Sequence, residues 1–387
     1  MKIIAKTLEN LEHVLGTELE AIGAEDIQIL KRAVTYQGDL SILYKSNLLL
    51  RTCLRVLVFI KEFPVKNESD LYAEIKDMPW EDYLGVDDTF AIDSIVNSDQ
   101  FRHANYIALK AKDAIADRFR DKYGKRPSVD VKSPDLKINV HIRQNIVTIS
   151  LDSSGSSLHM RGYRKNHVDA PLNEVLAAGL ILLSGWDKKS PLIDPMCGSG
   201  TILCEAAMIA SNRPPQKINR NFTFMKWKNF NSELYEQVCN DAVNGIIHSN
   251  LPPISGEDKI KSAVQAAMVN ITEAGLSDLI TVEQNDFFYH DDAQNTTLIF
   301  NPPYDARLKE DDVTDFYKHI GDKLKMSFKN CTAWIISGHL DALKHVGLRP
   351  SSKKALLNGE IPSLFCKYEM YEGSKKEKWK QRVPHED

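Results

Sequence analysis

A glycine-rich stretch at residues 194–201, Asp-Pro-Met-Cys-Gly-Ser-Gly-Thr, constrains the fold of this chain more than any other feature. It directly follows the apolar residues 192–193 and leads into an alanine-rich run, which is the pattern of a strand, a tight turn and a helix. Gly198 and Gly200 allow a sharp turn and a close approach to a ligand, and the helix that follows offers free N–H groups. The stretch lacks the Gly-Lys-Ser/Thr of a phosphate-binding P-loop, so it favours another nucleotide-like ligand.

The residues after this turn alternate between short apolar runs and helical patterns, which is typical of repeated βα units. Residues 354–357 and 363–371 flank Asn358-Gly359, a pair that favours a tight hairpin turn. The C-terminal half is therefore predicted to be α/β, with a mostly parallel sheet that ends in an antiparallel hairpin. Its predicted parallel strands are residues 192–194, 254–258, 280–286, 298–301 and 332–337.

The front half has a different pattern, in which strands and helices mix without βα repetition. A helix is predicted from Asn105 to Tyr123, because apolar residues recur at helical spacing until Gly124. Alternating apolar residues then predict a hairpin around Gln144-Asn145. The Ser-, Gly- and Arg-rich residues 155–167 are the best candidate for a domain boundary. Further strands are predicted at residues 2–6, 34–36, 54–63 and 90–95.

Polar residues stand at the ends of the predicted parallel strands, where such ends meet at one crevice of the sheet. Asp258 could accept hydrogen bonds from two ribose hydroxyls, and Asp286 beside Phe287 offers an acceptor next to an apolar face. Asn301 could accept from an amine, and Tyr304 could stack on a base swung out of its helix. Singly, each carboxylate could be a solvent-facing strand end. Together, the residues predict attack by an amino nitrogen on an electrophilic methyl group.

The loop DPMCGSGT, the helix EAAMIA and the stretch NPPYDARL resemble class I S-adenosylmethionine-dependent methyltransferases that methylate amino groups. More closely, RGYRKNHVDAPLNEVLAAGLILLSGW and NRPPQKINRNFTFMKWKNF resemble bacterial THUMP-bearing guanine-N2 methyltransferases of 23S ribosomal RNA. This resemblance implies a ferredoxin-like unit at residues 1–60, a THUMP RNA-binding domain at 61–158 and a Rossmann-like class I methyltransferase domain at 159–387.

The resemblance also implies S-adenosylmethionine as cofactor and assigns roles to individual residues. Relatives usually carry a second acid two residues after the Asp258 position, where this chain has Ile260. The ribose contact is therefore expected from Asp258 alone or from Asp258 shared with Glu257. The expected cofactor residues are Asp194, Cys197, Gly198, Ser199, Gly200, Thr201, Asp258, Asp286 and Phe287, and the expected catalytic residues are Asn301, Pro302, Pro303 and Tyr304.

The expected reaction is transfer of a methyl group from S-adenosylmethionine to the exocyclic N2 amine of a guanine in 23S rRNA. The catalytic motif leaves other acceptors open, namely a guanine in tRNA or the N6 amine of adenine in DNA. A non-catalytic RNA-binding assembly factor that keeps the fold is a further alternative. Cys197 lacks an evident activating base, so a packing role is expected for it, and the scattered cysteines predict reduced thiols and no metal site.

Charge gives little support to RNA binding as a whole-molecule property, because 49 basic against 53 acidic residues leave a net charge of −4. Basic residues nevertheless cluster locally, and the insert at residues 212–230 interleaves them with aromatic rings. These clusters could contact RNA, or they could be solvated faces and packed rings. No signal peptide or membrane span is evident, so a cytoplasmic protein is expected. The clustered basic residues include Arg118, Arg120, Lys122, Lys125, Arg126, Arg161, Arg164, Lys165 and His167.

Overall fold

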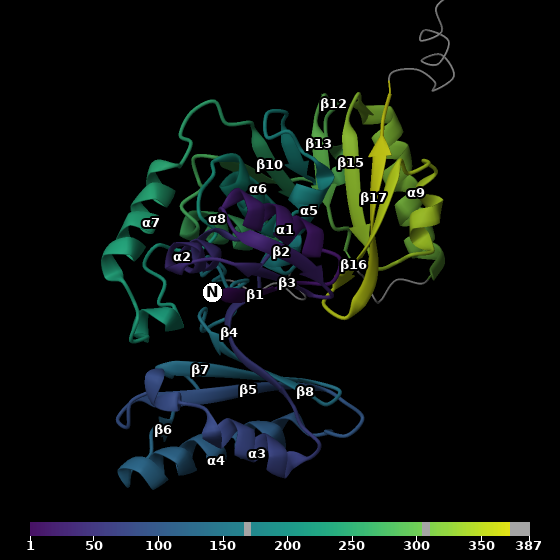
Figure 1. The fold of residues 1–387 in the computed structure, drawn as a ribbon. Helices are drawn as coiled ribbons and strands as arrows, with labels where there is room; N and C mark the ends of the chain where they lie inside the picture. Colours follow the sequence, from purple (N-terminus) through teal and green to yellow (C-terminus); the bar gives the residue numbers. More distant parts are fainter. Residues whose placement is uncertain (166–171, 304–309, 372–387) are drawn as a thin grey trace, which may run out of the picture. The chain divides into compact units, whose positions relative to one another are not determined.

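The computed structural model describes residues 1–165, 172–303 and 310–371 (Figure 1). The chain forms two units: unit 1 is Met1–Met160 with Gln216–Ala242, and unit 2 is Arg161–Pro215 with Val243–Asp387. Residues 216–242 thus belong to unit 1, although the predicted boundary at residue 159 groups them with the C-terminal domain. All six cysteines are buried free thiols. Within the described ranges, no helix combines the length and the apolar character that a membrane crossing needs.

Unit 1 begins with a small antiparallel sheet in the strand order β2-β3-β1-β4. Asp39 starts its second helix by accepting a hydrogen bond from the Ile42 N–H at 2.9 Å. Both helices bury one face on the sheet, in a core that includes Ile3, Leu15 and Tyr36. The elements are β1 (Lys2–Lys6), α1 (Glu12–Ala21), β2 (Glu25–Leu30), β3 (Ala33–Gln37), α2 (Leu40–Leu49) and β4 (Arg55–Pro64).

The long strand β4 continues this sheet into a second core, because it pairs with β1 on one side and with β8 on the other. The predicted helix and hairpin are both confirmed: Gly124 ends the helix at φ +67°, and Gln144 turns the hairpin at φ +53°. The elements here are α3 (Glu68–Asp77), η1 (Trp80–Asp82), β5 (Thr89–Asn97), α4 (Ala104–Tyr123), β6 (Ser128–Val129), β7 (Leu136–Arg143) and β8 (Ile146–Asp152).

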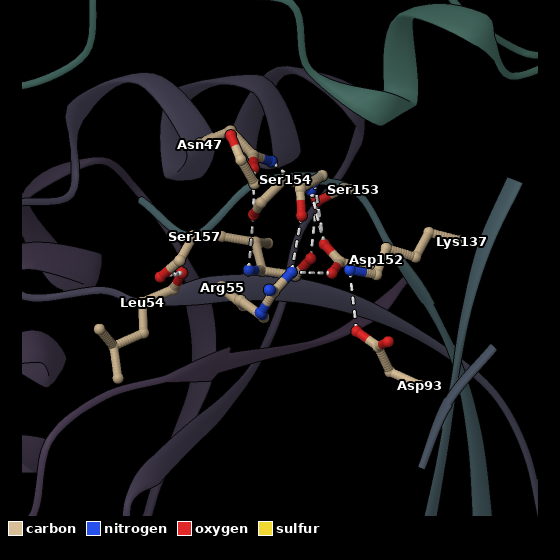
Figure 2. Close-up of polar contacts among 12 residues, drawn as sticks. Asn47, Leu54, Arg55, Asp93, Lys137, Asp152, Ser153, Ser154 and Ser157 are labelled. Atoms are coloured by element: carbon tan, nitrogen blue, oxygen red, sulfur yellow. Dashed lines mark hydrogen bonds and ion pairs between the residues drawn. The ribbon is translucent and has the colours of Figure 1, made fainter. Parts of the chain in front are cut away.

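A polar cluster closes the end of β8 inside unit 1 (Figure 2). One carboxylate oxygen of Asp152 accepts from Arg55 at 2.5 Å, and the other accepts from the backbone N–H groups of Ser154 and Gly155. Arg55 also donates to the Gly155 carbonyl at 2.7 Å. The cluster fixes the backbone where the chain leaves the sheet, since it satisfies groups that no strand pairing reaches.

The segment 216–242 packs on α2 of unit 1 through aromatic rings. Phe224 stacks on Tyr44 with ring centroids 4.7 Å apart, and Phe222 stacks on Phe224 at 5.2 Å. The Phe224 N–H donates to the Ser153 carbonyl at 3.2 Å, which ties the segment to the polar cluster. This segment contains η2 (Thr223–Lys226) and most of α7 (Ser232–Asn244).

Unit 2 contains a seven-stranded sheet in the order β11-β10-β9-β13-β15-β17-β16, in which the first five strands are parallel and the last two antiparallel. The predicted α/β fold is confirmed, and Gly359 turns the predicted hairpin at φ +63°. β9 lies between β10 and β13, so the strand order reverses there and a crevice is expected at its carboxyl end.

The elements of unit 2 alternate between strands and helices up to β11, and the later part of the unit also contains consecutive strands. They are α5 (Glu174–Ser184), β9 (Leu192–Asp194), α6 (Thr201–Ala210), β10 (Ile254–Asp258), α8 (Lys261–Glu273), β11 (Ile280–Gln284), η3 (Phe287–Tyr289), β12 (Ala293–Gln294), β13 (Thr297–Phe300), α9 (Glu310–Ser327), β14 (Phe328–Lys329), β15 (Thr332–Ser337), η4 (Ala342–Val346), β16 (Ser352–Asn358) and β17 (Ile361–Glu369).

Candidate active site

The glycine-rich loop joins β9 to α6 at the point where the strand order reverses. Gly198 and Gly200 have φ values of +53° and +78°, a region that favours glycine. A Cβ on Gly200 would lie 3.1 Å from the Ala267 side chain, whereas a Cβ on Gly198 would meet no heavy atom within 4 Å among the described residues. The positive φ and the close approach of Ala267 on α8 both favour glycine at position 200, while open space lies beside Gly198 near the N-terminus of α6.

Asp258 holds this loop from the end of β10. Its Oδ2 atom accepts from the Gly198 N–H at 3.0 Å, and its Oδ1 atom accepts from the Ile260 N–H at 2.9 Å. A carboxylate has about four lone-pair directions, so these two bonds leave capacity for ribose hydroxyls. The ribose contact of Asp258 stays a prediction, and the structure adds a role in bracing the loop.

Glu257 points to a different partner. Its Oε1 atom lies 2.7 Å from His290 Nδ1, while its buried Oε2 atom has no hydrogen-bond partner among the described residues. His290 stacks on Phe328 with ring centroids 5.3 Å apart, so the ring is held in place. Sequence reasoning missed His290, because nothing local marks a histidine that meets a carboxylate 33 residues earlier.

Asp194 is buried at the start of the loop and accepts from the Met196 N–H at 3.2 Å. Burial raises the pKa of this carboxyl well above its ordinary value, and the nearby Asp258 charge raises it further. A positively charged ligand would relieve both effects. This end of the loop therefore suits a cation, which is the charge of a sulfonium cofactor.

Cys197 packs under the loop rather than facing a reactant. Its thiol would lie 3.3 Å from a Cβ on Gly256, which shows how closely the loop approaches β10. Burial raises the pKa of this thiol, and the negative charges of Asp194 and Asp258 raise it further. A thiol that stays protonated is a poor nucleophile, so these contacts agree with the packing role expected for Cys197.

Asp286 and Phe287 follow the edge strand β11. The Asp286 carboxylate accepts from the Phe288 N–H at 3.1 Å and so begins η3. The Phe287 ring is only 2% exposed and packs against Phe300 and Phe328 in the core. The structure thus places this ring in the interior rather than on an open face, and the adenine contact expected for Phe287 stays a prediction.

Asn301 directly follows β13, the strand on the other side of the loop. Its Oδ1 atom is buried and has no hydrogen-bond partner among the described residues. A buried acceptor without a donor is costly, and it identifies a position that a ligand N–H can satisfy. Pro302 is buried and Pro303 is exposed, whereas Tyr304 lies outside the described residues.

The basic residues at 161–165 do not form the phosphate-facing surface that their clustering suggested. Arg161 is completely buried against Glu205, and Arg164 pairs with Glu174 at 3.1 Å. Of this group, only the Lys165 side chain is exposed, and His167 lies outside the described residues. The charges of Arg161 and Arg164 are thus paired with carboxylates inside unit 2.

The insert was also expected to offer aromatic rings and cations to RNA, but several of these side chains make contacts within unit 1. Phe222 and Phe224 are buried against Tyr44. Lys226 donates to the Ser133 carbonyl, and Lys228 donates to the Glu81 carbonyl. The alternative interpretation, that these rings pack the insert in place, is confirmed.

The cluster on α4 is partly engaged. Arg118 binds both carboxylate oxygens of Glu81, and Lys122 contacts the same group, which holds the Glu81 pKa well below its ordinary value. Lys125 and Arg126 are exposed just after the helix. A phosphate contact by these two residues stays open.

Comparison with known proteins agrees with this arrangement. Residues 161–367 match the family described as RMKL-like, methyltransferase domain, residues 65–152 match the THUMP domain, and residues 2–57 match the RlmL ferredoxin-like domain. A Synechocystis sp. protein named as a candidate RNA methyltransferase, slr0064, is 38% identical over 369 residues, or 95% of this chain and 96% of that protein.

Two further relatives add detail. The ribosomal RNA large subunit methyltransferase K/L of Syntrophotalea carbinolica is 34% identical over 386 residues, which cover 96% of this chain and 54% of that protein. The chain therefore spans about half the length of that relative. The crystal structure of SMU.472 in complex with SAH has a TM-score of 0.86 and 29% identity, and the match covers 96% of this chain and 99% of that one. The chain belongs to the RMKL-like, S-adenosylmethionine-dependent methyltransferase family and carries a THUMP domain ahead of its methyltransferase domain.

Proposed function

We propose that this protein transfers a methyl group from S-adenosylmethionine to the exocyclic N2 amine of a guanine in 23S rRNA. The proposal rests on Asn301, whose buried Oδ1 atom has no hydrogen-bond partner among the described residues. Asn301 follows β13, and β13 pairs with β9, the strand that leads into the glycine-rich loop. The THUMP match and the relative named for large-subunit ribosomal RNA support an RNA substrate. Such a substrate is consistent with a protein that acts in the cytoplasm.

The residues of unit 2 fit S-adenosylmethionine at the carboxyl end of the sheet. Asp194 offers a buried carboxyl that a cationic ligand would ionise, and the open space at Gly198 admits a ligand close to the backbone. Asp258 retains lone pairs for the ribose, and Asp286 borders the adenine position. Ser199, Gly200 and Thr201 present the N-terminus of α6 to the methionine part of the cofactor. When bound, the cofactor supplies an electrophilic methyl group.

Asn301 and Pro302 supply orientation. The N2 amine of guanine is a weak nucleophile, because its lone pair is delocalised into the ring. Asn301 Oδ1 and the Pro302 carbonyl oxygen would each accept one of the two amine hydrogens, which directs the lone pair away from them and toward the methyl group. The neighbouring prolines limit backbone motion at this point. Orientation of this kind accounts for much of the expected rate enhancement.

The alternatives differ in the acceptor base and in the nucleic acid that carries it. Asn301 can serve a guanine in tRNA or an adenine in DNA as well as it serves rRNA, because each presents an exocyclic amine. A non-catalytic assembly factor would have no use for a buried acceptor without a partner. Mass analysis of nucleosides from RNA and DNA, after incubation of each with enzyme and labelled cofactor, distinguishes N2-methylguanosine from N6-methyladenine.

The decisive variant is Asn301→Ala. Loss of an acceptor that acts at the reacting amine lowers methyl transfer to protein-free 23S rRNA by about 100-fold or more, while cofactor binding is retained. Gln294→Ala removes an exposed amide from the preceding segment and is the matched control, with activity like that of the wild type. Methylation by Asn301→Ala at the wild-type rate would remove the proposed role.

A further inference from the structure

Residues 161–165 lie against α6 and α8 within unit 2, and every basic side chain among them has a protein partner. We propose that this segment is a clasp that holds the N-terminus of α6 and the glycine-rich loop in the conformation that binds the cofactor, with Arg164 as its main positioning residue. The inference rests on the proposed cofactor site. It assigns a role to residues that no cofactor or substrate contact explains.

The first contact joins Arg164 to the end of the loop. Its guanidinium donates to Thr201 Oγ1 at 3.2 Å and to the Leu172 carbonyl at 2.7 Å, and it pairs with Glu174 at 3.1 Å. Thr201 is both the last residue of the loop and the first residue of α6. Arg164 therefore links the loop to the beginning of α5, where Glu174 lies in the first turn.

The second contact lies one helical turn further along α6. Glu205 follows Thr201 by four residues, so the two side chains share a face of the helix. Glu205 Oε1 accepts from Tyr163 at 3.2 Å and from Arg161 at 3.4 Å, and the Arg161 and Glu205 side chains are completely buried. Since Arg161 and Arg164 are three residues apart, the segment runs along this face and contacts it twice.

The third contact reaches the middle of the loop through Asn270 on α8. The side-chain Oδ1 atom of Asn270 accepts from the Lys165 N–H at 3.0 Å, and the side-chain Nδ2 atom of Asn270 donates to the Ser199 carbonyl at 3.1 Å. Asn270 is completely buried, so water does not compete for these bonds. Ser199 lies between Gly198 and Gly200, the two residues with the greatest backbone freedom, and this bond fixes the peptide between them.

Buried charges of this kind add little net stability compared with apolar residues of similar volume, so stability alone does not explain them. Their geometry explains them better, because all three contacts end on the loop or on the first turns of α6. A loop that is already ordered loses less conformational entropy when a ligand binds, and its affinity for that ligand is higher. The clasp is thus expected to act on cofactor affinity more than on the chemical step.

The test measures binding of S-adenosylhomocysteine by calorimetry to the full chain and its variants. Thr201→Val keeps the shape of the side chain and removes the acceptor of Arg164, and Arg164→Met removes the guanidinium. Each is expected to weaken binding about tenfold, the effect of losing one charge-assisted hydrogen bond. The KM for S-adenosylmethionine rises in parallel, and in Arg164→Met kcat at saturating cofactor stays close to that of the wild type.

Thr201→Ser restores the hydroxyl and is expected to restore most of the affinity. Lys344→Ala removes an equally basic residue from an exposed ion pair in the same unit and is expected to bind like the wild type. Melting temperatures identify any variant that fails to fold, and Arg164→Lys then replaces Arg164→Met. Wild-type affinity in Thr201→Val and Arg164→Met, or equal losses in Thr201→Ser and Thr201→Val, would overturn the clasp. Failure of the wild type itself to bind would instead contradict the proposed function.

Discussion

Each unit of the chain contains an arginine–carboxylate pair with a buried carboxylate, and the two pairs differ in what they contact. In unit 1, both oxygens of Asp152 are occupied, one by Arg55 and the other by two backbone N–H groups. In unit 2, Glu205 receives Arg161 and Tyr163 on one oxygen, while its buried second oxygen has no partner among the described residues. The first cluster satisfies backbone N–H groups at the end of a strand, whereas the second lies on α6, the helix that follows the glycine-rich loop.

The difference teaches that buried charge alone does not identify a functional site, whereas its surroundings do. The Asp152 cluster is bordered by the insert, through the Phe224 N–H on the Ser153 carbonyl. The Glu205 cluster is bordered by the glycine-rich loop, through Arg164 on Thr201. Disruption of the first should therefore affect folding of unit 1, and disruption of the second should affect both stability and ligand affinity.

The largest expected effect tests whether the insert is part of unit 1. Phe224→Ala removes a fully buried ring that stacks on Tyr44 and Phe222, and it is expected to lower the free energy of unfolding of unit 1 by about 4 kcal/mol. Urea unfolding followed by hydrogen exchange in unit 1 measures this change. Affinity for S-adenosylhomocysteine should not change, although Phe224 lies inside the sequence range of the methyltransferase match.

Phe230→Ala is the matched control, because Phe230 belongs to the same ring cluster but is less buried. A smaller destabilisation is expected for it. If Phe224→Ala left unit 1 intact and weakened cofactor binding, the insert would belong to unit 2 energetically and the comparison would fail.

The next effect concerns the pair in unit 2. Glu205→Gln removes the buried carboxylate that pairs with Arg161 and is expected to destabilise unit 2 by about 3 kcal/mol. The double variant Arg161→Met with Glu205→Leu removes both charges and should recover much of this loss. Denaturant unfolding of the three proteins gives the comparison. A double variant no more stable than Glu205→Gln would show that the charge pair is not the source of the effect.

The corresponding change in unit 1 should be smaller. Asp152→Ala leaves the backbone N–H groups of Ser154 and Gly155 without this acceptor and is expected to lower the free energy of unfolding of unit 1 by about 2 kcal/mol. The loss is smaller than in unit 2 because the partly exposed Arg55 can turn toward solvent. Asp152→Asn keeps an acceptor oxygen and should cost less. Equal destabilisation by the two variants, measured in the same unfolding assay, would indicate that the Arg55 pair and not the backbone is what Asp152 serves.

The sequence predicted those parts of the fold and site that depend on neighbouring residues. The glycine loop, the strand ends at Asp258 and Asn301 and both hairpins follow from local periodicity and turn chemistry. Each of these features is encoded within a few neighbouring residues, so one amino-acid sequence is enough to predict them. The resemblance to the methyltransferase family rests on the same local motifs.

Contacts between distant segments were beyond such reasoning. Phe224 meets Tyr44 across about 180 residues, and no periodicity indicates that an insert in one domain completes the core of another. The sequence predicts Arg161 and Arg164 as candidate RNA contacts, because the charge of a residue does not show whether its side chain is buried. Their partners, Glu205 and Thr201, lie in the helix that follows the glycine-rich loop. An acidic residue on the buried face of that helix is the sequence signal that indicates a buried basic partner.

The last prediction concerns Asp194 and has the smallest effect. Burial raises the pKa of this carboxyl in the free protein, so the carboxylate costs stability as the pH rises through the range between its ordinary and its raised pKa. A cationic ligand favours the charged form, so binding releases a proton, and affinity should increase with pH by at most about tenfold per pH unit.

Calorimetry of S-adenosylmethionine across a pH series, in two buffers of different ionisation enthalpy, measures both the slope and the released proton. Asp194→Asn should remove the slope, whereas Asp152→Asn should leave it unchanged, because the proposed cofactor site lies in unit 2. A slope that persisted in Asp194→Asn would assign the proton to another group and would weaken the distinction between the two units.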